Sequence, residues 1–238
     1  MKCLFIQKNN IQKNSILVTD KDYHHVVRVL RLQANEIIEL KDTDYAYTAV
    51  PKEVTKNSIR FSILSKRKLK IPKLNITLCL GILKTDAFNF VLEKTTELGV
   101  SKIIPYKAER SVVKINTNEE IKKNNKWQKI CEEAAKQCGC DIIPSVEKII
   151  NNIDMLNKPS TNKLIAYENE KTSSLKGCLK NINPNEEIII LIGPEGGFTE
   201  NEYQQAKSLG FASCLLNENT LKSETAVISI ISNILFYF

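Results

Sequence analysis

Two polar loops carry the residues best suited to hold a small ligand, and the first loop is rich in glycine. It covers residues 193–197, Gly-Pro-Glu-Gly-Gly, directly after an apolar stretch that ends at Ile192. Gly196 and Gly197 permit a close approach of the backbone to a ligand, while Pro194 stiffens the turn. The loop lacks the spacing of a P-loop and of a GxGxxG dinucleotide motif. It predicts either a ligand loop of another kind or a tight strand-to-helix turn.

The second loop, residues 215–226, again joins an apolar segment to a helix, which begins near Ser223. Ligands bind at the carboxyl ends of parallel strands, so two such loops could form two walls of one pocket. An ordinary surface connection is the alternative, because Glu224 is also stabilised at a helix N-terminus by the helix dipole.

Basic residues near the start of the chain could bind phosphate. Within residues 20–32, His24, Arg28 and Arg31 recur at i, i+4 and i+7, and His25 is adjacent. On an α-helix this spacing places the three side chains on one face. Arginine side chains suit a nucleic-acid backbone, although a solvated basic helix face has the same spacing.

The distribution of charge favours the nucleic-acid interpretation. The chain holds 34 Lys+Arg and 27 Asp+Glu, a formal net charge of +7. Residues 1–72 hold 14 basic and 7 acidic side chains, whereas residues 73–238 hold 20 of each, so the whole excess lies before Lys73. Arg67 and Lys68 belong to a basic stretch that we expect to form a linker or a basic edge. This concentration of charge favours nucleic-acid binding by the first part of the chain.

The apolar pattern indicates which elements position the two loops. From residue 75 onward, strand-like and helical segments alternate, which is typical of an α/β fold with a largely parallel sheet. Thr199 and Glu202 form a capping box at the start of one helix. The expected strands cover residues 76–80, 102–105, 163–167, 187–192 and 211–216, and the expected helices begin near Asp86, Asn118, Thr199 and Ser223.

Residues 1–72 indicate a smaller, β-rich domain. Its one expected helix begins with Asp20 as the cap. The apolar side of that helix would comprise Val26, Val27, Val29 and Leu30, and the expected strands cover residues 36–40, 45–50 and 59–64.

Several classes of protein are excluded by the composition. The longest apolar-rich stretch, residues 226–238, is shorter than the ~20 residues that span a bilayer. The seven cysteines, without an export signal, are typical of reduced thiols, so we expect a cytoplasmic protein. No CxxC pair is present, and the two histidines lie far from Cys131, Cys138 and Cys140 in the sequence, so we expect no metal.

These motifs together resemble one known family. GPEGGFTENE at 193–202, LxxxxLxxETA at 216–226 and the HH-V-VLRL helix resemble the bacterial 16S ribosomal RNA uridine-N3 methyltransferases of the SPOUT superfamily, the RsmE family. The resemblance covers nearly the whole chain in the expected order. It implies a PUA-like β-barrel domain in residues 1–72 and an α/β methyltransferase domain with a deep trefoil knot in residues 73–238.

The resemblance also implies a cofactor and partners. Members of the family act as homodimers, bind S-adenosylmethionine in the knot and methylate N3 of a uridine in the RNA of the small ribosomal subunit. The terminal helix after Ser223 would lie in the dimer interface, or alternatively in the core of one subunit. The cofactor site implied by the resemblance consists of Tyr167, Glu168, Leu191, Ile192, Gly193, Pro194, Glu195, Gly196, Gly197, Leu216, Asn217, Leu221, Ser223, Thr225 and Ala226.

The chemistry implied by the family requires removal of the imide proton of uridine and stabilisation of the resulting anion. We expect Lys222 to supply the positive charge, with Arg110 as the second candidate. Glu195 or Glu224 could accept the proton, although a structural role explains an acid at either position. The residues expected to bind RNA are His24, His25, Arg28, Arg31, Arg67, Lys68, Arg110 and Lys222.

Some positions depart from the family pattern. Asn217, Asn219, Lys222 and Cys140 stand where the family usually has Gly, Arg, Arg and Arg. Lys222 keeps the positive charge but not the planar two-point grip of arginine, whereas Asn219 and Cys140 lose the charge, so positive charge near the expected site is reduced. A non-catalytic RNA-binding or ribosome-associated protein that keeps the fold is therefore the alternative to an active methyltransferase.

Overall fold

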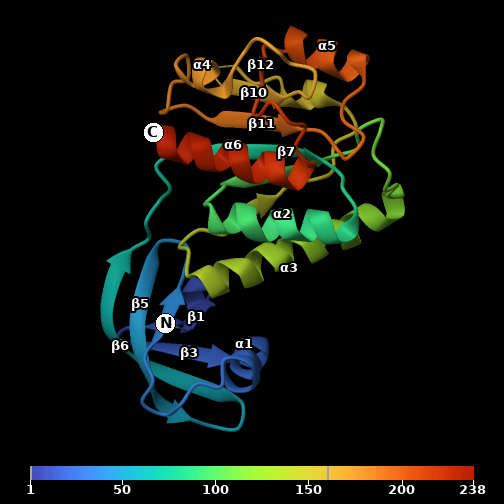
Figure 1. Ribbon diagram of the computed structural model, residues 1–238. Helices are drawn as coiled ribbons and strands as arrows, with labels where there is room; N and C mark the ends of the chain where they lie inside the picture. Colours follow the sequence, from blue (N-terminus) through green and yellow to red (C-terminus); the bar gives the residue numbers. More distant parts are fainter. Residues whose placement is uncertain (1, 160) are drawn as a thin grey trace. The chain divides into compact units, whose positions relative to one another are not determined.

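A six-stranded parallel sheet organises the C-terminal part of the chain in the computed structural model, which describes residues 2–159 and 161–238 (Figure 1). The strand order is β12-β10-β11-β7-β8-β9, and each neighbouring pair is parallel. The strands are β7 (Ile76–Gly81), β8 (Lys102–Tyr106), β9 (Ser145–Val146), β10 (Asn162–Ala166), β11 (Ile188–Ile192) and β12 (Ala212–Cys214).

The central strands β7 and β11 are buried on both faces of the sheet, which explains why they are largely apolar runs. Along β11, Ile190 belongs to one core cluster and its neighbour Leu191 belongs to the other. The first cluster includes Phe88 of α2 (Thr85–Glu97) and Ile230 of α6 (Ser223–Tyr237), two helices that lie side by side in Figure 1. The second cluster includes Ala206 of α5 (Glu200–Ser208). A polar ligand is therefore excluded from both faces and must bind at an edge formed by strand ends.

Helices alternate with the strands of this sheet along the chain. None of the helices in the described residues is long and apolar enough to cross a bilayer. The helices are α2 (Thr85–Glu97), α3 (Glu120–Cys138), α4 (Leu175–Leu179), α5 (Glu200–Ser208) and α6 (Ser223–Tyr237), with 3₁₀ turns at Thr117–Glu119 and Ile153–Leu156.

The expected parallel α/β alternation is confirmed, and so is the capping box of α5. Thr199 Oγ1 accepts a hydrogen bond from the Glu202 N–H at 3.3 Å, and Glu202 Oε2 accepts one from the Thr199 N–H at 2.8 Å. The start of α2 differs from the expectation, because Lys84 rather than Asp86 is its N-cap. A 3₁₀ turn at Thr117–Glu119 precedes α3, so the helix expected to begin near Asn118 begins at Glu120.

The first part of the chain forms a second six-stranded sheet, in the order β1-β4-β5-β6-β3-β2. β1 and β4 pair in parallel, and the other neighbouring strands are antiparallel. The sheet covers a core that includes Leu4, Ile16, Leu40 and Phe61. Its strands are β1 (Lys2–Phe5), β2 (Ile11–Gln12), β3 (Ser15–Thr19), β4 (Ile38–Lys41), β5 (Tyr45–Val54) and β6 (Ser58–Lys68).

The basic segment expected as a linker is largely strand. β6 continues to Lys68, and its register pairs Arg67 with Ala46 and Lys68 with Tyr45 of β5. The β5–β6 hairpin therefore extends to these basic side chains. The sequence prediction ended the strand at residue 64, where its apolar run ends.

The expected helix near the start of the chain is interrupted. α1 (Asp20–His24) passes into a π-helical turn at His25–Val29, in which the Leu30 N–H donates to the carbonyl of His25 at 2.9 Å. Thr19 rather than Asp20 is the N-cap. The helix is thus shorter than expected and only partly α-helical.

Because of this interruption, the prediction that His24, Arg28 and Arg31 share one helix face is wrong. An i→i+5 hydrogen bond adds a residue to the turn, so the α-helical spacing of His24 and Arg28 no longer aligns them. Arg31 lies beyond the turn and has a left-handed φ of 48°. The expected apolar side also differs, because Val27 and Val29 are 42% and 65% exposed.

The chain divides into two compact units. One comprises the chain up to Ile71 together with Ala135–Ile142, and the other comprises Pro72–Ala134 and Ile143–Phe238. The sequence places Ala135–Ile142 in the second domain, whereas the structure places it with the first sheet.

Lys41 explains why Ala135–Ile142 belongs to the first unit. The Lys41 side chain is fully buried, although it carries a charge. Its Nζ donates to the carbonyl oxygen of Gly139 at 2.8 Å and to that of Cys140 at 2.9 Å. A buried ammonium needs such acceptors, because an unpaired buried charge is strongly unfavourable.

Two carboxylates complete the surroundings of this ammonium. Lys41 Nζ pairs with Glu39 at 2.9 Å and with Asp141 at 2.8 Å. Burial by itself would lower the pKa of Lys41, but the hydrogen bonds to Asp141 and Glu39 outweigh burial and raise it. Arg67 donates to the same two carboxylates, which lowers the pKa of Asp141 below its ordinary value. Two cations and two carboxylates therefore compensate one another.

Replacement of Lys41 with Met should destabilise the first unit. The Lys41→Met variant keeps the length of the side chain but removes the ammonium from two carbonyls and from two carboxylates that then have only Arg67 as a cationic partner, which costs about 3–5 kcal/mol. Urea denaturation monitored by circular dichroism measures the loss. The matched control is Lys56→Met, which removes an exposed lysine of the same unit. Equal unfolding midpoints for the two variants would contradict the assignment.

Candidate functional site

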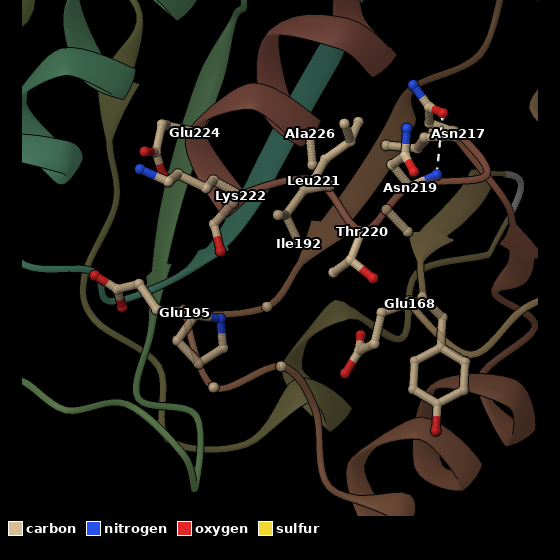
Figure 2. A pocket seen from close by; sticks show the side chains of 18 of the residues that line it. Glu168, Ile192, Glu195, Asn217, Asn219, Thr220, Leu221, Lys222, Glu224 and Ala226 are labelled. Atoms are coloured by element: carbon tan, nitrogen blue, oxygen red, sulfur yellow. Dashed lines mark hydrogen bonds between the residues drawn. The ribbon is translucent and has the colours of Figure 1, made fainter.

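A pocket of about 630 Å³ opens where four neighbouring parallel strands end (Figure 2). Its walls are the segments that follow β7, β10, β11 and β12, together with the first turn of α6. Its lining residues are Lys84, Asp86, Ala87, Ala166, Tyr167, Glu168, Ile192, Gly193, Pro194, Glu195, Gly196, Gly197, Cys214, Leu215, Leu216, Asn217, Glu218, Asn219, Thr220, Leu221, Lys222, Ser223, Glu224 and Ala226.

The loop after β11 packs closely against the end of β7, and a glycine permits this contact. A Cβ atom on Gly81 would lie 2.5 Å from the backbone nitrogen of Pro194. At the other end of the loop, Gly197 has a φ of 68°, and its missing side chain leaves room for the Glu168 carboxylate. The backbone of the loop thereby forms one wall of the pocket without side chains filling the space.

Glu195 connects this loop to helix α2. Its Oε1 accepts a hydrogen bond at 2.9 Å from the N–H of Lys84, the N-cap residue of α2. A carboxylate at this position also interacts favourably with the positive end of the helix dipole. Glu195 therefore holds Lys84 and the start of α2 at the rim of the pocket.

Arg110 supports the glycine-rich loop from outside the pocket. Its Nη1 donates to the carbonyl oxygens of Gly196 at 3.3 Å and of Phe198 at 3.1 Å. A Cβ atom on Gly196 would lie 3.0 Å from the Cβ of Arg110, so the two backbones are in close contact. These contacts suit a positioning role for Arg110.

A buried carboxylate fixes the segment before Arg110 to the start of α5. Glu202 Oε1 accepts hydrogen bonds from the Tyr106 hydroxyl at 2.6 Å and from the Glu109 N–H at 3.0 Å. Burial and then the hydrogen bond to Glu202 raise the pKa of Tyr106 well above its ordinary value, so the phenol remains a donor. Through the capping box with Thr199, the same carboxylate also orders the end of the glycine-rich loop.

The loop after β10 is ordered by another carboxylate. Glu170 Oε1 accepts hydrogen bonds from the N–H groups of Lys171, Thr172 and Ser173 at 3.0–3.1 Å. These bonds, led by that from Thr172, lower the pKa of Glu170 to about 2. The carboxylate therefore remains ionised over the physiological range and keeps the turn beyond Glu168 closed.

The remaining walls combine apolar and charged groups. Ile192, Leu216 and Leu221 supply apolar surface, which suits the face of a flat ring. Lys222 is the N-cap of α6, and no hydrogen bond or ion pair holds its ammonium among the described residues. In Figure 2, Lys222 and Glu224 lie together at the start of α6, at the opposite end of the pocket from Asn217.

Cys214 lines the pocket but is not suited to attack a substrate. Its side chain is buried, and burial raises the pKa of the thiol to about 12. The thiol donates to the carbonyl of Ile165 at 3.4 Å. Because the thiolate is the nucleophilic form, a neutral Cys214 disfavours covalent catalysis in this pocket.

The structure brings together nearly all the residues that the sequence assigned to the cofactor. Two of them do not line the pocket: Leu191 is buried in the core behind it, and Thr225 is exposed on α6. The sequence assignment missed the segment after β7, from Lys84 to Ala87. The sequence did predict that a strand ends near residue 80. It did not predict that this strand, β7, lies beside β11, which is what places the segment after β7 at the pocket.

The residues expected to bind RNA lie in different places. Lys222 lines the pocket, and Arg110 lies behind the glycine-rich loop. His24, His25, Arg28 and Arg31 belong to the first unit but do not share a single α-helical face. Arg67 is bound by the carboxylates of Glu39 and Asp141, which gives its guanidinium a structural role. Lys68 ends β6.

Comparisons with known proteins cover both units. A family model described as an RNA methyltransferase domain matches residues 70–235, and one described as an RNA methyltransferase PUA domain matches residues 18–64. Ribosomal RNA small subunit methyltransferase E of Mesomycoplasma hyopneumoniae is 35% identical over 94% of this chain and 95% of its own length. Ribosomal RNA small subunit methyltransferase E 2 of Borreliella burgdorferi is 32% identical, over 96% and 94% respectively.

A solved structure shares the fold of the whole chain. The crystal structure of a ribosomal RNA small subunit methyltransferase E from Neisseria gonorrhoeae, bound to S-adenosyl methionine, superposes with a TM-score of 0.87. The two sequences are 32% identical, and the match covers 100% of this chain and 98% of that one.

The Gly81→Ala variant should disturb the pocket through the loop after β11. The added methyl group would meet backbone atoms of Pro194, and such overpacking costs about 1–3 kcal/mol. Urea denaturation should show this loss. Gly177→Ala serves as the control, because its Cβ would meet only Ser174 Oγ at 3.4 Å within a helix. The close contact would be refuted if both variants were as stable as the parent protein.

Proposed function

The chain belongs to the RNA methyltransferase family of ribosomal RNA small subunit methyltransferase E, and from this we propose that it uses S-adenosylmethionine to methylate N3 of a uridine in 16S ribosomal RNA. One observation carries the proposal. The pocket at the ends of β7, β10, β11 and β12 gathers thirteen of the fifteen residues that the family resemblance assigns to the cofactor. The relatives supply the class of RNA, and the family resemblance supplies the uridine nitrogen.

The residues of the pocket fit S-adenosylmethionine. The volume of about 630 Å³ lies in the usual range for a small-molecule site. Ile192, Leu216 and Leu221 would contact the adenine ring, and the backbone around Gly193 and Gly197 leaves room for main-chain hydrogen bonds to polar edges of the cofactor. When bound, this cofactor supplies an electrophilic methyl group on a sulfonium.

Lys222 would stabilise the negative charge that uridine acquires when N3 loses its proton. Its ammonium has no hydrogen-bonding partner among the described residues and lines the same pocket as the apolar walls. A positive group held in a partly closed site stabilises a developing anion more strongly than the same group in water. The role of the rest of the pocket is to align the reacting atoms.

Of the two acids expected to accept the proton, Glu224 is better suited. Glu195 already uses one oxygen to cap α2, and moving it would release the N–H of Lys84. Glu224 lies in the first turn of α6 beside Lys222, and its carboxylate has no hydrogen bond among the described residues. We propose Glu224 as the proton acceptor, with Glu195 and Arg110 as positioning residues.

The proposal extends to topology, assembly and location. The segments after β10, β11 and β12 would form the deep trefoil knot of the family. The end of α6 would contribute to a homodimer, because Phe236 is 93% exposed and Leu235 and Tyr237 are also exposed. RNA of the small ribosomal subunit as the substrate implies a cytoplasmic protein. The first unit would hold the RNA through its excess of positive charge.

A direct assay tests the function. The protein is incubated with methyl-labelled S-adenosylmethionine and either intact small subunits or free 16S RNA, and the modified base is mapped. The expected product is one N3-methyluridine. Calorimetry with S-adenosylmethionine distinguishes the alternative, a non-catalytic RNA-binding protein, which would bind RNA but not the cofactor.

Replacement of Lys222 with Ala should reduce methyl transfer by about 10²–10³-fold, the usual effect of losing one donor to a developing anion. Calorimetry should give nearly unchanged cofactor affinity, because the apolar walls and the glycine-rich loop remain. The control is Lys180→Ala, which removes an exposed lysine outside the pocket. Turnover of Lys222→Ala at the rate of the control would reject the role of Lys222.

The Phe236→Asp variant should abolish the dimer. Light scattering should give a mass of twice the chain's 27.0 kDa for the parent protein and 27.0 kDa for the variant. Ile121→Asp is the control, since Ile121 is an equally apolar residue that is 76% exposed on α3. A parent protein that is monomeric, or a variant that remains dimeric, would contradict the assignment of this surface.

A further inference from the structure

The first unit contains a second hollow, distinct from the pocket described above. It has a volume of about 650 Å³ and lies among the β2–β3 hairpin, β5 and β6. Three of its residues are cationic, and the others carry hydroxyl or amide groups. Its lining residues are Gln12, Lys13, Asn14, Ser15, Lys52, Arg60 and Ser62.

Two local irregularities of the backbone bring lysines to this hollow. Lys13 is the first of two turn residues between the paired Gln12 and Ser15, and it has a left-handed φ of 47°. That conformation favours glycine or asparagine, so a lysine there is unusual. Strained residues of this kind are concentrated at functional sites.

The second irregularity is a β-bulge at Lys52. Pro51 pairs with Phe61 and Glu53 pairs with Arg60, so Lys52 is the extra residue of β5. A bulge re-aims a side chain that a regular strand would direct elsewhere. The hairpin turn and the bulge, which are far apart in the sequence, thus both direct a lysine to the same hollow.

Arg60 is held in place between these lysines. Its Nη1 donates to Gln12 Oε1 at 2.9 Å and to Ser15 Oγ at 3.4 Å, and its Nε donates to Glu53 at 3.3 Å. Glu53 neutralises one of the three positive charges. Lys13 and Lys52 have no hydrogen bond or ion pair among the described residues, so a net charge of about +2 remains available.

We propose that this hollow binds a phosphodiester group of the RNA backbone. The proposal rests on the proposed function. It adds a new site, because none of the residues predicted from the sequence to bind RNA lines this hollow. Two free ammonium groups supply charge, and the hydroxyl of Ser62 supplies a neutral donor for a phosphate oxygen. The Arg60 guanidinium is oriented by its bonds to Gln12, Ser15 and Glu53, which leaves its Nη2 to donate to the same group.

The test compares the full-length double variant Lys13→Ala/Lys52→Ala with the parent protein. Binding to a 16S RNA transcript is measured over a series of salt concentrations in the presence of S-adenosylmethionine. Loss of one phosphate contact should reduce the slope of log K against log salt by about 0.7–0.9. Cofactor affinity and unfolding midpoint should remain those of the parent, because neither lysine contacts another described side chain through its ammonium.

Two further variants complete the test. Lys148→Ala/Lys180→Ala removes the same charge from exposed lysines of the other unit and should keep the parent slope. The Lys13→Arg/Lys52→Arg variant should keep the parent slope, because arginine preserves both positive charges.

A double-alanine variant with the parent slope would overturn the inference while leaving the proposed function intact. A parent protein that binds neither RNA nor cofactor would instead contradict the proposed function itself. Inorganic phosphate that binds the hollow without competing with RNA would also overturn it.

Discussion

The parallel pairing of β7, β11, β10 and β12 is the constraint on which the site depends. Parallel strands end at the same edge of a sheet, so loops that begin near residues 82, 167, 193 and 215 meet although the sequence separates them widely. The two faces of the sheet are filled by separate apolar cores. The strand ends are therefore the part of this unit where polar backbone groups remain available to a ligand.

Charged side chains around the pocket serve mainly to hold these loops. Glu202 and Glu170 accept several hydrogen bonds each, and Glu195 caps α2. Arg110 donates to two carbonyls of the glycine-rich loop. Lys222 and Glu224, at the start of α6, make no such side-chain hydrogen bond among the described residues, which is why the proposed function assigns the chemistry to them.

The parts of the fold that depend on local pattern could be predicted from the sequence. Buried strands such as β11, the Thr199–Glu202 capping box and the glycine-rich loop have short-range signals, and the structure contains each of them. Features that depend on distant partners could not be predicted. Lys84 joins the pocket because β7 lies beside β11, and Arg67 is neutralised by Asp141, 74 residues later. The π-helical turn at His25–Val29 likewise has no short-range signal in its residue types.

The buried ammonium of Lys41 has a consequence for how such a protein can evolve. Its acceptors at Gly139, Cys140 and Asp141 lie within a stretch whose flanking segments, before Ala135 and after Ile142, belong to the other unit. The chain thus leaves the first unit, returns to it and leaves again. A recombination event that exchanged only the first seventy residues would deliver a new sheet without the matching acceptors. The two units must consequently be inherited together, and change at either side of this contact requires compensation about a hundred residues away.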